Sequence, residues 1–388
     1  MLAIAAPSFN APSETFIRNH VQQIAPGRTV LLCNDPSGAQ QFGCPVLSPI
    51  DPWSPPQTLG ERVVNAIRHR WRSYIRAGLN SADRKRIAAY LNKHEVTALL
   101  AEYGPIGCLV MDACEDTGVS LFVHFHGYDA NILPRNWREQ KLYHKLFSRA
   151  ERVIAASQFM RRRLISLGCA PERIEVIPCG VDVRRFSPGA ADKREPLVLM
   201  VSRLIRQKGP TYSLEAFAKL ARRFPDLRLE IIGEGPLQEE LRTRARAHGI
   251  EDRVYLHGAR PHDFVCERLR CARLLIQHCM TLPGEGVESL GLSILEAMAC
   301  GVPVVATRHG AIVETVQDGV TGFLVPEGDV KGMADAMAAL LTDTDRAAAM
   351  GAAGRARVLE HFTIEHARDR LRTIMGLHPV TSTPVYAA

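Results

Sequence analysis

The hydrophobic pattern consists of short apolar runs that alternate with longer stretches of helical character, and the whole alternation occurs twice along the chain. Most of the runs are apolar throughout, which is typical of parallel strands covered on both faces. We expect strands at 2–7, 29–34, 98–104, 121–127, 152–157 and 174–178 in the first half, and at 196–202, 227–233, 254–258, 273–278, 302–306 and 322–325 in the second.

This repetition predicts two doubly wound α/β domains, and 388 residues with 46% hydrophobic content suffice for two cores. Proline, glycine and charge interrupt the pattern at 186–196, FSPGAADKREP, where we place the link between the domains. Ligands bind such sheets at the carboxyl ends of the strands, so we expect a site in a cleft between the domains. The predicted parts are a Rossmann-like domain at 1–188, a second at 189–360, a helix at 361–378 and a disordered tail at 379–388.

Composition limits the class of protein. No run approaches the ~18 apolar residues of a membrane span. The first residues, MLAIAAPSFN, lack a basic start, and their apolar run is too short for a signal sequence. The ten cysteines contain no C-x-x-C pair, and singles such as Cys33, Cys108 and Cys300 are typical of buried thiols in a reducing compartment. We therefore expect a cytoplasmic protein.

The segment 284–307, GEGVESLGLSILEAMACGVPVVAT, places Glu288 and Glu296 on either side of a change from loop to helix. We expect the helix to begin near Gly291 and to end at Gly301, before a buried strand. One carboxylate then lies in the loop and the other on the helix.

The amides of Gly291, Leu292 and Ser293 would stand free at the helix N-terminus, which is a ready site for a phosphate group. Carboxylates near a phosphate are suited to accept hydrogen bonds from hydroxyls on either side of it. A nucleotide sugar has this layout, with Glu288 toward the sugar and Glu296 toward the ribose.

Two further loops follow predicted strands. The loop VSRLIRQKG brings together Arg203 and Lys208, two cations that can neutralise a diphosphate and stabilise it as a leaving group. The turn IIGEGP contains Gly233 and Gly235, which let the backbone approach a ligand closely.

These segments resemble the family-4 retaining glycosyltransferases of the GT-B fold. The two glutamates with LEAMACGVPVVA, the SRLIRQKG loop and the GEGP turn occur in the family's order, as do LAEYGP, HFHGYD, ASQFMRRRL and IPCGVD in the first half. Each motif alone has limited specificity, but together and in order they are highly specific. The resemblance covers roughly residues 1–375 and implies two Rossmann-like domains facing across a cleft, with the last helix returning to the N-terminal domain.

The resemblance implies that Arg203 and Lys208 hold the donor diphosphate, that Glu288 binds the transferred hexose, and that Glu296 binds the ribose. It places His126, in the motif HFHGYD, near the reaction centre. The implied catalytic residues are His126, Arg203, Lys208 and Glu288, and the implied donor-binding residues are Gly233, Glu234, Gly235, Ser289, Leu290, Gly291, Leu292 and Glu296.

One position departs from the family, which usually has glycine where Ser289 follows Glu288, so the sugar pocket is expected to differ in shape. The first loop also lacks the paired glycines of many relatives. The residues implied for the acceptor are Ser13, Glu14, Thr15, Arg18, Glu102, Tyr103 and Asp129.

The implied reaction transfers a hexosyl unit, with retention, from a UDP- or GDP-sugar to a glycan or glycolipid acceptor in surface glycan synthesis. No metal or other cofactor is expected, because Arg203, Lys208 and the helix N-terminus carry the required charge and no clear D-x-D metal element stands out. His257, His262 and His278 lack metal-ligand spacing.

The excess of basic over acidic residues lies entirely in the first half of the chain. Residues 1–190 contain 23 Lys and Arg against 16 Asp and Glu, whereas residues 191–388 contain 25 against 25. Residues 61–93 alone have nine basic residues against two acidic ones. This region could lie on an anionic membrane at the inner face of the cell, or form a solvated helix packed on its own domain. A nucleic-acid partner is not expected, since no binding module accompanies the charge.

Other functions stay open. A sugar-nucleotide epimerase would use the same donor site without an acceptor, and a phosphorylase would need a pyridoxal-binding lysine that no motif marks. A non-catalytic scaffold binding membrane or protein through 61–93 is a third class, and the set of Arg203, Lys208, Glu288 and Glu296 argues against it. Glu234 contacts the base or ribose, or is merely solvated, and His124 is expected to be buried and structural.

Overall fold

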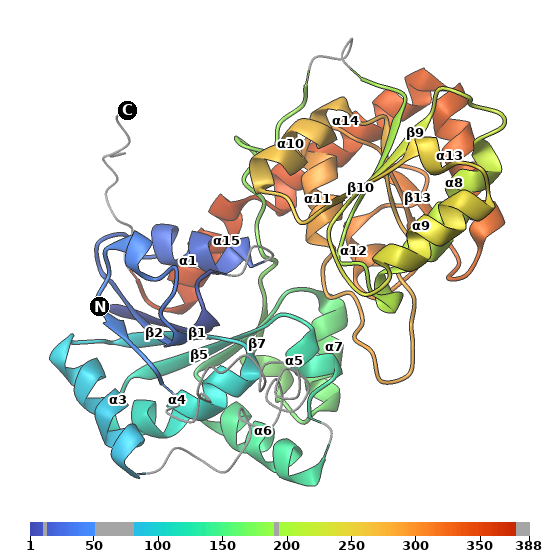
Figure 1. Ribbon diagram of the computed structural model, residues 1–388. Helices are drawn as coiled ribbons and strands as arrows, with labels where there is room; N and C mark the ends of the chain where they lie inside the picture. Colours follow the sequence, from blue (N-terminus) through green and yellow to red (C-terminus); the bar gives the residue numbers. More distant parts are fainter. Residues whose placement is uncertain (11–13, 51–80, 135, 190–193, 378–388) are drawn as a thin grey trace. The chain divides into compact units, whose positions relative to one another are not determined.

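The computed structural model describes residues 1–10, 14–50, 81–134, 136–189 and 194–377 (Figure 1). These residues form two compact units. The first contains residues 1–156 and 160–177 together with the chain from Ala367, and the second contains residues 157–159 and 178–366. Each unit is built on its own sheet.

The first unit has a seven-stranded sheet in the order β3-β2-β1-β4-β5-β6-β7, and all of its pairings are parallel. Its strands are β1 (Leu2–Ser8), β2 (Thr29–Asp35), β3 (Val46–Leu47), β4 (Ala98–Glu102), β5 (Ser120–Phe125), β6 (Arg152–Ala155) and β7 (Ile174–Val176). The helices along this part of the chain are α1 (Thr15–Gln23), α3 (Ser81–Lys93), α4 (Gly104–Thr117), α5 (Tyr128–Asn131), α6 (Trp137–Arg149) and α7 (Gln158–Ser166).

Both faces of this sheet are buried, which explains its continuous apolar runs. Along β1, Ala3 and Ala5 enter the core cluster beneath α3, α4 and α6, while Leu2, Ile4 and Ala6 enter the cluster beneath α1. Successive strand residues point to opposite faces, so a strand covered on both sides requires apolar residues at every position.

The second unit repeats the arrangement with a six-stranded parallel sheet in the order β10-β9-β8-β11-β12-β13. Its strands are β8 (Leu197–Val201), β9 (Arg228–Ile232), β10 (Val254–Gly258), β11 (Leu274–Gln277), β12 (Val304–Thr307) and β13 (Gly322–Val325). Its helices are α8 (Pro210–Leu220), α9 (Gln238–Ala247), α10 (His262–Cys271), α11 (Leu292–Ala299), α12 (Ile312–Thr315), α13 (Val330–Thr342) and α14 (Thr344–His361).

The last described helix, α15 (Ile364–Ile374), brings the chain back to the first unit. Ala367, Leu371 and Met375 are buried in the same core cluster as α1, and Figure 1 shows α15 in red beside α1. Ile374 is partly buried against the same cluster, whereas Phe362 precedes the helix.

The twelve predicted strands and the two parallel sheets are confirmed. Among the described strands, the hydrophobic pattern fails to predict only β3, because its two residues, Val46 and Leu47, are too few to show a period. Ser13, the stretch 51–80 and the tail from 378 lie outside the described residues, and so does most of the basic region. No helix among the described residues is long and apolar enough to cross a membrane.

Candidate active site

The loop between β8 and α8 holds both predicted diphosphate ligands. Arg203 is exposed on the first part of the loop, and Lys208 ends the short 3-10 helix Arg206–Lys208 before Gly209 begins the turn into α8. Gly209 has a φ of +54°, and a Cβ there would lie 1.8 Å from the carbonyl oxygen of His278. The turn that presents Lys208 therefore requires glycine.

Lys208 and Glu288 form an ion pair, although they are 80 residues apart in sequence. Only 15% of the lysine side chain and 12% of the glutamate side chain are exposed. Burial by itself would raise the pKa of Glu288, but Lys208 lowers it below its usual value. Burial would likewise lower the pKa of Lys208, but Glu288 raises it. Both groups are therefore held in their charged forms.

Three further hydrogen bonds hold Glu288, two through its main chain and one through its side chain. Its N–H donates to Nε2 of His309 at 3.1 Å, and its carbonyl oxygen accepts from the N–H of Ala311 at 2.9 Å. Its side-chain Oε1 accepts from the N–H of Gly291, the N-cap of α11, at 3.3 Å. The predicted glutamate, the predicted lysine and the predicted helix N-terminus are thus in direct contact within the second unit.

His309 was not anticipated from the sequence. Its imidazole is buried, with Nδ1 lying 2.7 Å from Oε1 of Glu327 and 3.2 Å from the hydroxyl of Thr281. Since Nε2 accepts from the N–H of Glu288, the proton of the neutral ring lies on Nδ1. The only signal was the pair His309 and Gly310 in the loop that follows the predicted strand 302–306.

Glu296 lies in the middle of α11, one turn before the end of the helix, and is 6% exposed. Burial raises its pKa to about 8, while Arg185 acts in the opposite direction. Nδ1 of His262 is 3.8 Å from Oε1 of Glu296. Because the carboxyl is neutral below that pKa, it can donate as well as accept a hydrogen bond.

Gly233 and Gly235 allow two backbone segments of the second unit to pack closely together. A Cβ on Gly233 would lie 1.9 Å from the carbonyl oxygen of Ser202, and one on Gly235 would lie 2.5 Å from that of Leu204. The glycines therefore let the turn after β9 pack against the loop of Arg203, backbone to backbone, as the bond from the N–H of Leu204 to the carbonyl of Glu234 at 2.8 Å illustrates.

The remaining predicted donor residues differ in exposure. Ser289 and Leu290 are 8% and 7% exposed, whereas the side chain of Glu234 is exposed and Leu292 is half-buried. Whether any of them contacts a donor stays a prediction.

His126 follows β5 in the first unit, on a turn built by Asp129. Oδ1 of Asp129 accepts from the N–H groups of His126 at 3.1 Å and of Gly127 at 2.9 Å, and Oδ2 accepts from the N–H of Gly104 at 3.1 Å. Asp129 is only 2% exposed, and burial raises its pKa. These contacts give Asp129 a structural role, which does not fit its predicted contact with an acceptor.

Glu102 does not fit that prediction either. It is fully buried at the end of β4, and its two oxygens face imidazoles, Oε1 at 2.6 Å from Nδ1 of His20 and Oε2 at 2.7 Å from Nε2 of His126. His20, on α1, was not singled out from the sequence.

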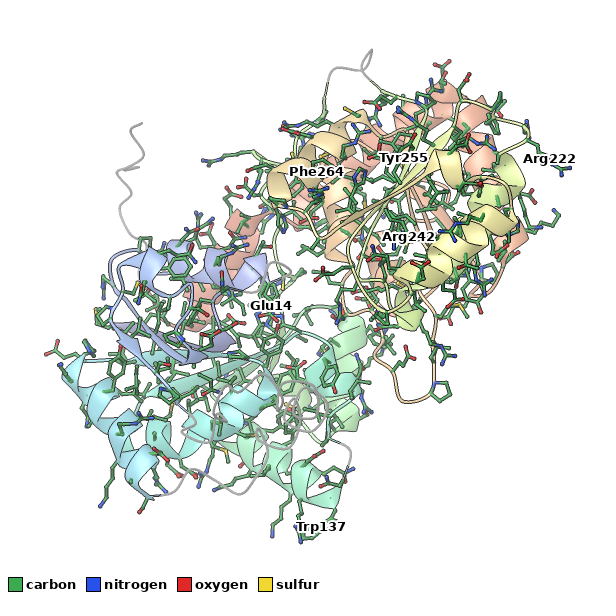
Figure 2. The ribbon with its side chains drawn as sticks, in the orientation of Figure 1. Glu14, Trp137, Arg222, Arg242, Tyr255 and Phe264 are labelled. Carbon is green, nitrogen blue, oxygen red and sulfur yellow. The ribbon has the colours of Figure 1, made fainter. Side chains whose placement is uncertain are left out.

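The other predicted acceptor residues lie around α1 and the end of β4. Glu14 is the residue before α1 (Figure 2), with Thr15 and Arg18 half-exposed on the helix. Burial and the neighbouring Glu14 raise the pKa of Tyr103 well above its usual value. Tyr103 also has a φ of +79°, an uncommon conformation for a residue other than glycine and one that often marks functional sites.

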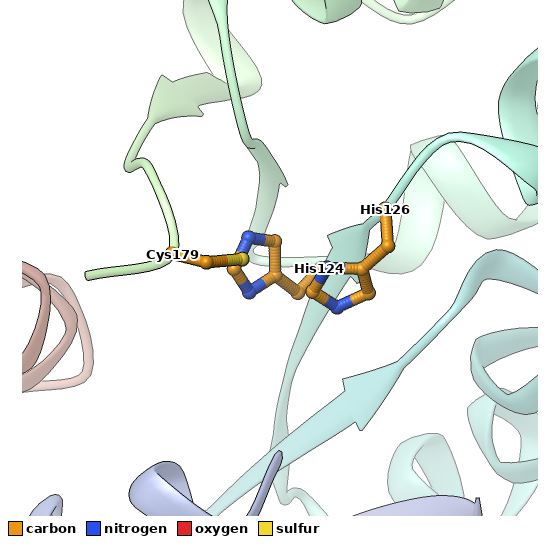
Figure 3. A group of neighbouring side chains, drawn as sticks. All are labelled: His124, His126 and Cys179. Atoms are coloured by element: carbon orange, nitrogen blue, oxygen red, sulfur yellow. The ribbon is translucent and has the colours of Figure 1, made fainter. Parts of the chain in front are cut away.

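Two groups of candidate metal ligands occur among the described residues. One contains His20, Glu102 and His124, the other His124, His126 and Cys179 (Figure 3), and in each the ligand atoms lie within 4.8 Å of one another. A D-x-D sequence does occur, at 343–345, contrary to the expectation above, but the side chain of Asp343 caps α14 by accepting from the N–H of Arg346. His257 and His278 are engaged with Glu230 and with the N–H of Gly328.

Two family models match the chain: residues 184–357 match Glycosyl transferases group 1, and residues 29–185 match Glycosyltransferase Family 4. The chain is 38% identical over 238 residues to the GDP-mannose-dependent alpha-(1-6)-phosphatidylinositol monomannoside mannosyltransferase of Mycolicibacterium smegmatis, an alignment that covers 58% of this chain and 62% of that protein. It is 31% identical over 282 residues to the putative colanic acid biosynthesis glycosyltransferase WcaL of Escherichia coli, covering 71% of this chain and 69% of that protein.

Among solved structures, the fold is similar to that of HepE from Anabaena in complex with UDP, with a TM-score of 0.77 at 20% identity over 97% of this chain and 99% of the other. At that identity the likeness concerns the fold alone. Together with the two sheets and the arrangement around Glu288, these matches identify the chain as a member of the family-4 glycosyltransferases of the GT-B fold.

Proposed function

We propose that the protein is a retaining hexosyltransferase that transfers a sugar from a nucleotide diphosphate sugar to a lipid-linked or polysaccharide acceptor. The observation that carries this proposal is the contact of Lys208, Glu288 and the N-terminus of α11 in one place. A cation, a carboxylate and helix amides suit a diphosphate that is joined to a sugar rich in hydroxyls.

In this proposal Lys208 and Arg203 neutralise the diphosphate, with help from the amides at the start of α11. Glu288 accepts hydrogen bonds from the hexose hydroxyls and Glu296 binds the ribose. The bond between the anomeric carbon and the phosphate oxygen breaks, and the acceptor oxygen bonds to that carbon on the same face. The acceptor proton passes to the leaving phosphate, and His126 contacts the hexose near the reacting carbon.

The two cations and the helix N-terminus also support metal-independent catalysis. Positive charge directed at the oxygen that leaves can supply several kcal/mol of transition-state stabilisation, on the order of the ~3 kcal/mol lost when one such donor is removed. We propose that no divalent ion is needed for the transfer.

The acceptor is proposed from the relatives. One similar protein is named for a phosphatidylinositol monomannoside and another for colanic acid biosynthesis, so a glycolipid or a growing polysaccharide is the expected acceptor class. We propose a cytoplasmic enzyme that contacts the inner face of the cell membrane through the basic region 61–93. Within the described part of that region, Ile87 and Leu91 of α3 are buried in the core. Lipid contact by α3 would therefore involve the other residues of this helix.

A product assay tests the proposal. The purified protein is incubated with radiolabelled UDP- or GDP-hexose and a membrane-lipid or polysaccharide fraction, and label is followed into the acceptor. Labelled acceptor with a retained anomeric configuration supports the proposal. Conversion of the donor into a second sugar nucleotide without an acceptor would indicate an epimerase instead.

A further inference from the structure

Glu102 is a buried carboxylate surrounded by imidazoles: those of His20 and His126 lie at hydrogen-bond distance, and Nδ1 of His124 lies 3.9 Å from Oε2. It ends β4, His20 comes from α1, and His126 follows β5, where Figure 3 shows it close to His124. The exposed fractions of the three side chains are 0% for Glu102, 6% for His20 and 7% for His126.

Each oxygen of Glu102 lies within hydrogen-bond distance of one ring nitrogen, Oε1 at 2.6 Å from Nδ1 of His20 and Oε2 at 2.7 Å from Nε2 of His126. An ionised carboxylate can only accept hydrogen bonds. Each imidazole must therefore present an N–H to it, His20 through Nδ1 and His126 through Nε2.

The rest of His126 is held by other groups. Its main-chain N–H donates to Asp129, which fixes the turn. Its ring packs 4.2 Å from that of Phe16 and 4.9 Å from that of Tyr103, centroid to centroid. These ring contacts limit where the side chain lies, and the bond to Glu102 selects which ring edge points into the protein.

We propose that Glu102, held in turn by His20, is the positioning residue of His126, fixing its proton on Nε2 and the orientation of its ring. This inference rests on the role of His126 in the proposed function. With the proton of the neutral ring held on Nε2, Nδ1 can act only as an acceptor, so in the proposed function a hexose hydroxyl that contacts Nδ1 is the donor.

The first test uses the unmodified protein and is independent of activity. Nitrogen-15 NMR of the histidine side chains, at a pH where the ring of His126 is neutral, reports which nitrogen carries the proton. The signal is assigned by its loss in His126→Gln. We expect the Nε2–H form, and an Nδ1–H form would overturn the proposal.

The second test compares variants by release of nucleoside diphosphate from whichever of UDP- or GDP-hexose binds the wild type, with the membrane-lipid or polysaccharide fraction of the product assay as the hexosyl acceptor. Glu102→Gln keeps the size of the side chain but can no longer accept from both rings. We expect kcat to fall about 10- to 100-fold, as for a small misplacement of a reacting group, with donor affinity within twofold. Unchanged kcat would contradict the positioning role.

Glu230 provides the matched control. It is also buried, at 5% exposure, and holds the imidazole of His257 at 3.0 Å, together with the guanidinium of Arg268 at 2.6 Å, on β9 of the second unit. We expect Glu230→Gln to lower stability and to leave kcat within twofold. An equal loss of kcat in both variants would mean that loss of any buried carboxylate explains the effect.

Two variants of His20 test the proposal if the Glu102→Gln protein does not fold. His20→Asn keeps an N–H near the position of Nδ1 and should retain most of kcat, whereas His20→Leu should lose about tenfold because Glu102 loses one of its two supports. Equal kcat in the two variants would count against the proposal. A wild type that binds no sugar nucleotide and releases no nucleotide would refute the proposed function, whereas donor binding with unaltered variants would refute only the positioning.

Discussion

Lys208 and Glu288 neutralise each other in a buried ion pair, although the proposed reaction assigns the lysine to the diphosphate and the glutamate to the hexose. The pair is mostly buried, with 15% and 12% of the side chains exposed. Each group thus holds its partner in the charged form. The pair therefore links stability of the free protein to the chemistry of the site.

We expect Lys208→Met and Glu288→Gln each to destabilise the protein by about 1–3 kcal/mol, because each leaves a buried charge without its partner. The double variant should cost less than the sum, with a coupling of roughly 0.5–3 kcal/mol in urea unfolding. The exposed pair Lys331 and Asp335 is the control and should couple by under about 0.5 kcal/mol. Strict additivity at Lys208 and Glu288 would show that the ion pair contributes nothing.

Glu296 predicts a pH dependence of stability. Its pKa in the folded protein, about 8, lies above the value of 4.5 usual for glutamate, so folding retains a proton that the unfolded chain releases between these values. Its contribution to stability is full below about pH 4.5 and is lost as the pH rises through about 8. The measurement is the free energy of unfolding from pH 5 to 9. Glu296→Gln should remove this decline, and parallel curves for the two proteins would contradict the assignment.

His309 predicts different effects for two similar substitutions. His309→Gln can place an amide oxygen near Nε2 and still accept from the N–H of Glu288, whereas His309→Asn reaches only the position of Nδ1. Losing this bond costs about 1 kcal/mol, so donor affinity should fall about fivefold in the Asn variant and change little in the Gln variant. Calorimetric titration with the donor checks this, and equal affinities would mean that the bond to Glu288 is unimportant.

Metal removal should leave the reaction intact. After exhaustive dialysis against EDTA, turnover with the preferred donor is expected to stay within twofold of the untreated enzyme, because Arg203 and Lys208 supply the positive charge. A loss above tenfold that Mg²⁺ or Mn²⁺ restores would refute metal independence.

The returning helix α15 should support the first unit. Leu371 is fully buried, and Leu371→Ala is expected to cost about 2–5 kcal/mol of stability. Leu359, which is 42% exposed on α14, is the control, and Leu359→Ala should cost under about 1 kcal/mol. We also expect a chain ending at Gly354 to be crippled in folding or activity, and a truncated enzyme with normal activity would disprove this.

The fold could be predicted because it is encoded by long, regular signals. Strands such as β1 and β8 are buried on both faces and read as continuous apolar runs. Strand β3 has two residues and owes its conformation to pairing with β2, a tertiary effect without a local signature.

The site was predictable where the chemistry repeats a family motif and less so where it depends on partners distant in sequence. Lys208 and Glu288, both taken from family motifs, form an ion pair in the folded chain, while their roles toward a donor stay predictions. Glu102 and Asp129 stand beside motif residues, but their roles follow from burial and from His20, His126 and Gly104, which only the folded chain brings to them. His309 likewise acquires its position from Glu327 and the loop of Glu288.

The central claim is that Lys208 and Glu288 hold a nucleotide sugar. A thermal-unfolding screen of the wild type, Lys208→Ala, Glu288→Ala and the surface control Lys331→Ala against UDP-, GDP- and ADP-sugars tests it most directly. At about a hundred times the dissociation constant, a bound donor should add ~2.7 kcal/mol to the wild type and to the control. We predict that one donor class does so and that both site variants lose the effect. Equal stabilisation of the site variants, or no stabilisation of the wild type by any donor, would contradict the account.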